Sequence, residues 1–139
     1  MNLNLYSLAH PVTALGPGTR VVLWVAGCEK RCADCISPEM QDPAAGTPVA
    51  VDVLLRRLLR LEPELDGITV SGGEPFDQAP ALMELFAGLR LERPGWSVMV
   101  YSGYAIEEIQ ADPAGRARLL EQVDILIDGR FERDVPPSQ

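Results

Sequence analysis

Lysine, histidine and cysteine are scarce in this 139-residue sequence, which contains one, one and three of them, respectively. No stretch is rich in basic residues, and the net charge is −8 at pH 7. Nucleic acid is therefore disfavoured as the main partner, because proteins that grip phosphate backbones present clusters of lysine and arginine. An odd number of cysteines excludes a framework in which every cysteine is paired in a disulfide. Reduced thiols of this kind suit metal binding or redox chemistry in the cytoplasm.

Long apolar segments are also absent from the sequence. The longest apolar runs fall far short of the roughly 20 residues needed to cross a bilayer. The first residues, Met1 to Leu5, lack the basic start and the apolar centre of a signal peptide. We therefore predict a cytoplasmic protein with no membrane contact. The length and the 47% of hydrophobic residues predict one domain over residues 1–139, ending in a flexible polar tail over 132–139.

All three cysteines lie within eight residues, Cys28-Glu29-Lys30-Arg31-Cys32-Ala33-Asp34-Cys35. The spacing is C-x3-C-x2-C, and we expect a loop over residues 26–37. The thiols could be idle, a disulfide such as Cys28–Cys32 could leave one of them free, or a structural zinc could take His10 as its fourth ligand. We favour an iron–sulfur cluster, because it is bound by thiolates and tolerates a missing fourth protein ligand.

Strand-like and helix-like segments alternate along the rest of the chain. Residues 21–26 are apolar and rich in β-branched side chains, as in a strand buried on both faces. Further strands are predicted at 68–70, 97–101 and 123–128, and helices at 53–61, 77–91, 106–110 and 116–122, the first capped by Asp52 and turning Val53 inward. Residues 2–9 are predicted as an edge strand and residues 42–48 as a loop. Such strand–helix repeats predict an α/β fold with a parallel sheet backed by helices.

Distinctive loops follow the predicted strands. Ligands bind at the carboxyl ends of strands in parallel sheets. At those ends the sequence places the cysteine loop, Ser71-Gly72-Gly73-Glu74-Pro75, Ser102-Gly103-Tyr104 and Asp128-Gly129-Arg130. Two of these interpretations stay open: Asp128 and Arg130 either contact a ligand or form a solvated ion pair. The earlier turn Gly16-Pro17-Gly18 is either a plain strand connection or a loop lying against a ligand.

In combination, Cys28-x3-Cys32-x2-Cys35 after one strand and Ser71-Gly72-Gly73-Glu74-Pro75 after the next resemble the radical S-adenosylmethionine enzymes. The finer similarity is to the small activating enzymes of anaerobic ribonucleotide reductase and their glycyl-radical activase relatives. It extends from Leu15 to Phe131, and rests also on Gly16–Arg20, Tyr101–Tyr104 and Asp124–Phe131. The resemblance implies a partial, open TIM-like barrel of parallel strands with helices outside. The charged residues Glu29, Lys30, Arg31 and Asp34 depart from the family pattern.

The same resemblance implies a cofactor site. Cys28, Cys32 and Cys35 would ligate a [4Fe-4S] cluster, whose fourth iron would bind the amino and carboxylate groups of S-adenosylmethionine. The residues implied to contact S-adenosylmethionine are Gly72, Gly73, Glu74, Pro75, Ser102, Gly103, Tyr104 and Asp128. No side chain is implied to act as an acid or a base, in agreement with the lack of a recognisable nucleophile–base pair in the sequence.

The implied activity is that of an oxidoreductase. A one-electron donor of the flavodoxin or ferredoxin type would reduce the cluster, and S-adenosylmethionine would be cleaved to methionine and a 5′-deoxyadenosyl radical. In the activases, that radical removes a hydrogen atom from a glycine of a large partner, such as anaerobic ribonucleoside-triphosphate reductase.

Two other functions stay open at this point. The first is a radical enzyme acting on a small molecule, similar to 7-carboxy-7-deazaguanine synthase, although we identify no residues that would recognise a heterocycle. The second is a non-catalytic iron–sulfur module for electron transfer. That module would need a fourth cysteine ligand, which the sequence lacks, and it gives Gly72–Pro75 no role.

Overall fold

The computed structural model describes residues 1–27, 42–61, 64–112 and 115–128. Its strands are β1 (Asn2–Val12), β2 (Arg20–Val25), β3 (Thr47–Ala50), β4 (Gly67–Gly72), β5 (Ser97–Tyr101) and β6 (Ile125–Ile127). Its α-helices are α1 (Val51–Leu59), α2 (Ala79–Glu92), α3 (Ile106–Gln110) and α4 (Arg116–Leu120), and two short 3-10 helices are η2 (Pro43–Ala45) and η3 (Pro75–Gln78).

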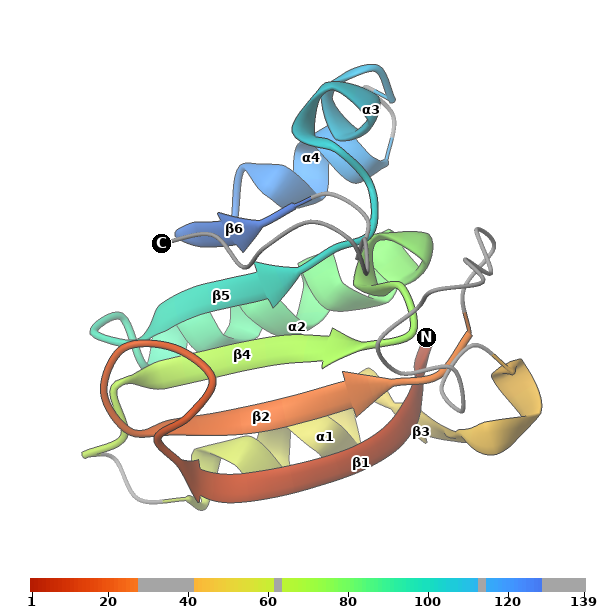
Figure 1. Cartoon of the computed structure of the whole chain (residues 1–139). Helices are drawn as coiled ribbons and strands as arrows, with labels where there is room; N and C mark the ends of the chain where they lie inside the picture. Colours follow the sequence, from red (N-terminus) through yellow and green to blue (C-terminus); the bar gives the residue numbers. More distant parts are fainter. Residues whose placement is uncertain (28–41, 62–63, 113–114, 129–139) are drawn as a thin grey trace.

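These strands form a single six-stranded sheet in the order β3-β1-β2-β4-β5-β6. The four strands β2, β4, β5 and β6 are parallel, in a register that places Val22 beside Thr69 and Met99 beside Ile125. The predicted α/β fold with parallel strands is confirmed for this part of the sheet. In Figure 1 the arrows of β2, β4 and β5 point to the same side of the molecule.

Strands β1 and β3 extend the sheet in the antiparallel sense, so the sheet is mixed. Two predictions were wrong here: β1 is not at the edge, and residues 47 and 48, the end of the predicted loop, begin strand β3. The edge position belongs to β3, which pairs with β1 on one side. An edge strand tolerates Pro48 because one of its sides needs no backbone donor.

Helices α1 and α2 lie behind the sheet in the view of Figure 1 and cover one face of it. The core between them and the sheet follows the alternation of the strands, because successive side chains point to opposite faces. Val21, Leu23 and Val25 of β2 belong to this core, whereas Arg20, Val22 and Trp24 point to the other face. Two details of α1 differ from prediction: the helix begins at Val51 after an Ala50 cap, with Asp52 inside its first turn, and Val53 is exposed. The inward side of α1 is instead formed by Val51, Leu54 and Leu58.

The amino and carboxyl ends of the parallel strands carry different kinds of loop. The turn containing Gly16, Pro17 and Gly18 joins β1 to β2 and lies at the amino ends, where Leu15 O accepts a hydrogen bond from Thr69 Oγ1 at 2.8 Å. The turn is therefore a strand connection, and its contact with a ligand stays a prediction. The predicted loops after β4 and β5 lie at the opposite, carboxyl ends.

No helix in the described ranges has both the length and the apolar character needed to cross a membrane.

Candidate cofactor site

The glycine pair at the end of β4, Gly72 and Gly73, lies directly against the end of β2. Gly72 has a φ of 108°, and a Cβ atom there would lie 2.3 Å from Val25 O. A side chain at this position is excluded both by the left-handed backbone and by the neighbouring strand. The next two amides continue the contact, since Gly73 N donates to Val25 O and Glu74 N donates to Gly27 O, both at 2.8 Å. The glycine pair is thus fixed beside the residue that precedes Cys28.

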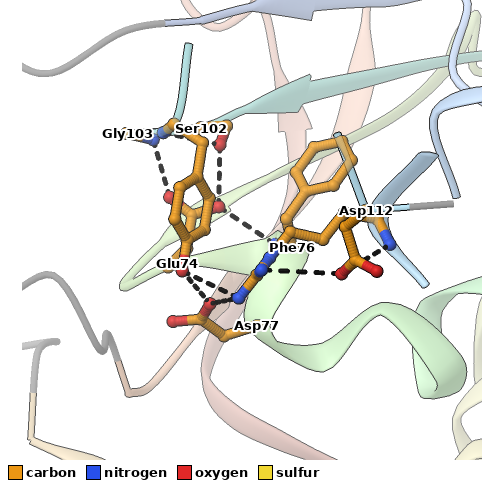
Figure 2. Close-up of polar contacts among 8 residues, drawn as sticks. Glu74, Phe76, Asp77, Ser102, Gly103 and Asp112 are labelled. Atoms are coloured by element: carbon orange, nitrogen blue, oxygen red, sulfur yellow. Dashed lines mark hydrogen bonds and ion pairs between the residues drawn. The ribbon is translucent and has the colours of Figure 1, made fainter. Parts of the chain in front are cut away.

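Glu74 connects the β4 loop to the β5 loop through its carboxylate. Gly103 N donates to Oε1 at 2.6 Å, and Ser102 Oγ donates to Oε2 at 2.8 Å. Phe76 N also donates to Oε2, at 3.0 Å, so Glu74 caps η3 as well. Figure 2 shows Glu74 pointing toward Ser102 and Gly103. Two segments that are 28 residues apart are therefore held together by one side chain.

The Glu74 side chain is completely buried. Burial raises the pKa of its carboxyl above the ordinary value, and the three donated hydrogen bonds oppose that shift without cancelling it. The carboxylate is occupied by donors of the protein itself. A direct contact between Glu74 and a cofactor stays a prediction.

A second group of polar side chains packs Tyr104 against η3 and α4. Tyr104 Oη donates to Asp77 Oδ1 at 2.5 Å, and Arg116 donates to both Asp77 Oδ1 (3.0 Å) and Tyr104 Oη (2.9 Å). The Arg116 guanidinium also lies 4.4 Å from the centre of the Tyr104 ring, and pairs with Asp112 at 3.5 Å. Figure 2 includes the Asp77 and Asp112 ends of this group.

This group changes the protonation behaviour of its members. Burial and the bond to Asp77 raise the pKa of Tyr104, so its hydroxyl stays protonated as a donor. Burial lowers the pKa of Arg116, but the hydrogen bond to Asp77 and the charges around it raise the pKa overall. We did not predict Asp77 and Arg116 from the sequence: they are 39 positions apart, and no local spacing relates them.

The other predicted site residues are Pro75, Asp128 and four residues outside the described ranges. Pro75 is buried at the start of η3, next to Glu74. Asp128 follows β6, is exposed, and accepts a hydrogen bond from Ile106 N at 2.7 Å, which places it at the start of α3. Ser102 N donates to Ile127 O at 2.8 Å, so the β5 loop and the end of β6 are adjacent. Arg130, Cys28, Cys32 and Cys35 lie outside the described residues.

The structure therefore brings seven predicted cofactor residues together at one edge of the sheet, namely Gly72, Gly73, Glu74, Pro75, Ser102, Gly103 and Tyr104. Gly27, which leads into the cysteines, bonds to the same loop. Within the described ranges no group of three histidine, cysteine or acidic side chains could hold a metal ion. Any thiolate site of this chain must use the residues between Gly27 and Asp42, since all three cysteines lie there.

Comparison with known proteins gives consistent similarities. Residues 14–139 match the family described as a 4Fe-4S single cluster domain. The chain is 30% identical over 141 residues to the anaerobic ribonucleoside-triphosphate reductase-activating protein of Escherichia coli strain K12, covering 97% of this chain and 88% of that protein. It is 32% identical over 124 residues to the protein of the same name from Pasteurella multocida, covering 86% and 78%. A shorter match, 38% over 94 residues, is to the pyruvate formate-lyase-activating enzyme of Staphylococcus aureus, covering 63% of this chain and 37% of that enzyme.

Proposed function

Because this chain belongs to the family of anaerobic ribonucleoside-triphosphate reductase-activating proteins, we propose that it is a radical S-adenosylmethionine enzyme that installs a glycyl radical on a partner enzyme. One observation of the site carries the proposal. At the end of β4, Gly73 N donates to Val25 O and Glu74 N donates to Gly27 O, directly beside the point where the chain enters the C-x3-C-x2-C segment.

The donor set fits a [4Fe-4S] cluster held by Cys28, Cys32 and Cys35. Three thiolates are soft ligands that suit iron–sulfur chemistry, and they leave one iron without a cysteine. When bound, the cluster supplies the electron that cleaves S-adenosylmethionine to methionine and a 5′-deoxyadenosyl radical, which takes a hydrogen atom from a glycine of the partner.

The chain's own residues bind and orient the cofactor. Gly72 and Gly73 have no side chains, so their backbone can lie against the methionine part of S-adenosylmethionine. Glu74 fixes this backbone relative to Ser102 and Gly103, so we assign it a positioning role. Its direct contact with the cofactor stays a prediction. Tyr104 and Asp128 complete the predicted contacts. No proton transfer by a side chain is needed for the hydrogen-atom abstraction itself.

The partner proposed from the relatives is a glycyl-radical enzyme of the reductase type. The flavodoxin- or ferredoxin-type donor, the cytoplasmic location, the single domain over 1–139 and the lack of nucleic-acid or membrane binding stay predictions. We also propose that the parallel strands β2, β4, β5 and β6 form part of an open TIM-like barrel, with the cofactor at their carboxyl ends.

Anaerobic reconstitution with iron and sulfide tests this function. After reduction with S-adenosylmethionine present, the chain should form 5′-deoxyadenosine and methionine in equal amounts. Cys32→Ala should lose the cluster and this product, whereas Ser37→Ala, close to the third cysteine but without a thiol, should keep both. A fully loaded chain that forms no 5′-deoxyadenosine would rule out the radical enzyme and leave the electron-transfer module.

A second measurement separates activation of a protein from chemistry on a small molecule. The loaded chain is mixed with an anaerobic ribonucleoside-triphosphate reductase, reduced, and examined by electron paramagnetic resonance. We expect a glycyl radical on the reductase that requires S-adenosylmethionine. Formation of 5′-deoxyadenosine without any radical on the reductase would instead favour another substrate.

A further inference from the structure

Asn4 of β1 contacts both ends of the chain segment that contains the cysteines. Its Nδ2 donates to Pro43 O at 2.8 Å and to Ala26 O at 3.3 Å. Ala26 is two residues before Cys28, and Pro43 begins η2, immediately after the segment 28–41 and Asp42. One amide group therefore bridges the backbone on both sides of the cysteines.

Gln78 joins the same bridge to the glycine loop. Its Oε1 accepts from Asn4 N at 2.7 Å, and its Nε2 donates to Ala26 O at 3.1 Å and to Asn4 O at 3.4 Å. Gln78 is the last residue of η3, the short helix that Glu74 caps. The two amide side chains thus connect Ala26, Pro43 and η3, which come from three separate parts of the chain.

Close packing around Asn4 indicates that this arrangement is specific. A Cβ atom on Gly46 would lie 2.6 Å from Asn4 Oδ1 and 2.7 Å from Ala26 Cβ, so only glycine fits beside the bridge. A Cβ atom on Gly27, whose φ is 103°, would lie 3.6 Å from Pro43 Cγ. An ordinary strand end needs none of these contacts, since Ala26 N already donates to Asn4 O at 3.0 Å through the backbone.

We propose that Asn4 and Gln78 are positioning residues for the cluster: they hold Ala26 and Pro43 at a fixed separation and fix both against η3. The segment that contains the three cysteines then begins and ends at points that are fixed relative to η3. The inference rests on the proposed function, because it assigns the cysteines to a cluster. The partial burial of these bonds makes their loss measurable.

Hydrogen exchange of the cluster-free chain tests the bridge itself. In Asn4→Ala, the amides of Ala26 and Gly46 should exchange about five- to tenfold faster, as expected from the loss of one or two hydrogen bonds. The amides of β5 should not change. Asn2→Ala is the matched control, because Asn2 is exposed on the same strand. Unchanged exchange at Ala26 would overturn the proposal.

Iron release from the loaded chain tests the positioning role. Under an excess of an iron chelator, Asn4→Ala should lose iron about five- to tenfold faster than the wild-type chain and Asn2→Ala do. This factor corresponds to the free energy of one or two lost hydrogen bonds. The change that S-adenosylmethionine causes in the cluster's paramagnetic resonance spectrum should weaken in parallel. If Asn4→Ala does not fold, Gln78→Glu gives the same test, since it keeps the acceptor for Asn4 N but loses the donors to Ala26 and Asn4.

The outcomes separate the two hypotheses. Normal iron uptake with equal release rates in all variants would overturn the role of Asn4 and Gln78 and leave the proposed function standing. Failure of the wild-type chain to take up iron would overturn the proposed function and, with it, this role.

Discussion

Two fully buried charged side chains lie at opposite ends of the parallel strands, Arg20 at the amino ends and Glu74 at the carboxyl ends. Both are satisfied by uncharged partners. The Arg20 guanidinium donates five hydrogen bonds, to Thr69 Oγ1, Pro17 O, Ser97 Oγ, Ile68 O and Ser97 O. Glu74 accepts from two backbone amides and one hydroxyl.

Burial acts on the two groups in the same physical way. It lowers the pKa of Arg20, although Asp66 and Asp124 oppose the shift, and it raises the pKa of Glu74. The difference lies in their surroundings. Arg20 fixes a plain turn between β1 and β2, whereas Glu74 fixes the loops that we propose to hold the cofactor. A buried charge therefore stabilises the fold at one end of the sheet, whereas at the other end a buried charge positions the loops of the proposed cofactor site.

The largest effect should follow from Arg20→Met. Removing the buried guanidinium deletes all five of its hydrogen bonds and leaves a methionine among their polar acceptors, so we expect the free energy of unfolding to fall by about 4 kcal/mol. Urea denaturation of the cluster-free chain measures it. Arg57→Met, an exposed arginine of α1, should stay within about 0.5 kcal/mol of the wild type. A loss below about 1 kcal/mol at Arg20 would show that its five bonds contribute little.

Glu74→Gln should lower the free energy of unfolding by less than Arg20→Met does. It should also weaken the binding of S-adenosylmethionine. Either orientation of the new amide places an NH2 group against the backbone N–H of Gly103 or of Phe76, at an expected cost of about 2 kcal/mol. Binding of S-adenosylmethionine to the loaded chain, measured by anaerobic equilibrium dialysis, should weaken about tenfold, a factor equivalent to 1.4 kcal/mol. Glu84→Gln, on the exposed side of α2, is the control. If Glu74→Gln destabilises the chain but leaves cofactor binding unchanged, Glu74 would support only the fold, as Arg20 does.

The pH dependence of stability should report the raised pKa of Glu74. The folded chain holds this proton more tightly than the unfolded chain does. The resulting stabilisation is fully present below the ordinary carboxyl pKa and is lost as the pH rises through the raised value. We therefore expect the wild type to lose its advantage in unfolding free energy over Glu74→Gln as the pH rises. The loss should be at most about 1.4 kcal/mol per pH unit. A difference that grows with pH would mean that the donors outweigh the burial.

The smallest effects are expected from two serines that bond to these charges. Ser97 Oγ accepts from Arg20, and Ser102 Oγ donates to Glu74, each at 2.8 Å. Ser97→Ala and Ser102→Ala should each lower the unfolding free energy by about 1 kcal/mol. S-adenosylmethionine binding should weaken, about threefold to fivefold, in Ser102→Ala alone, because that serine holds the β5 loop. Equal weakening in both variants would contradict the division between fold and site.

The sequence was sufficient to predict the parallel strands and the gathering of the glycine loop and the β5 loop at one edge. Continuous apolar segments such as Val98–Val100 identify strands buried on both faces, and parallel pairing then brings their carboxyl ends together. The four-residue strand β3 was missed because it contains a proline and has two exposed positions, so it carries no apolar alternation. Its place in the sheet comes from pairing with β1.

The side-chain connections of the site could not be predicted from the sequence. Glu74 and Gly103 are 29 positions apart, and Asn4 and Gln78 are 74 apart. Hydrogen bonds over such separations leave no local periodicity, because they depend on where the packed elements place each side chain. The motif at Gly72–Glu74 indicated a ligand, but not that its carboxylate turns inward to hold the next loop.

Strand β1 lies between β2 and β3, the two strands that bracket the cysteine segment. The attachment points of that segment are therefore fixed by a third strand, and a longer segment adds only a small entropy cost of joining them. Doubling the length of such a connection costs about 0.6 kcal/mol. Residues inserted between Cys35 and Asp42 should leave the sheet intact, whereas residues inserted between Cys28 and Cys35 should disrupt the cluster that we propose.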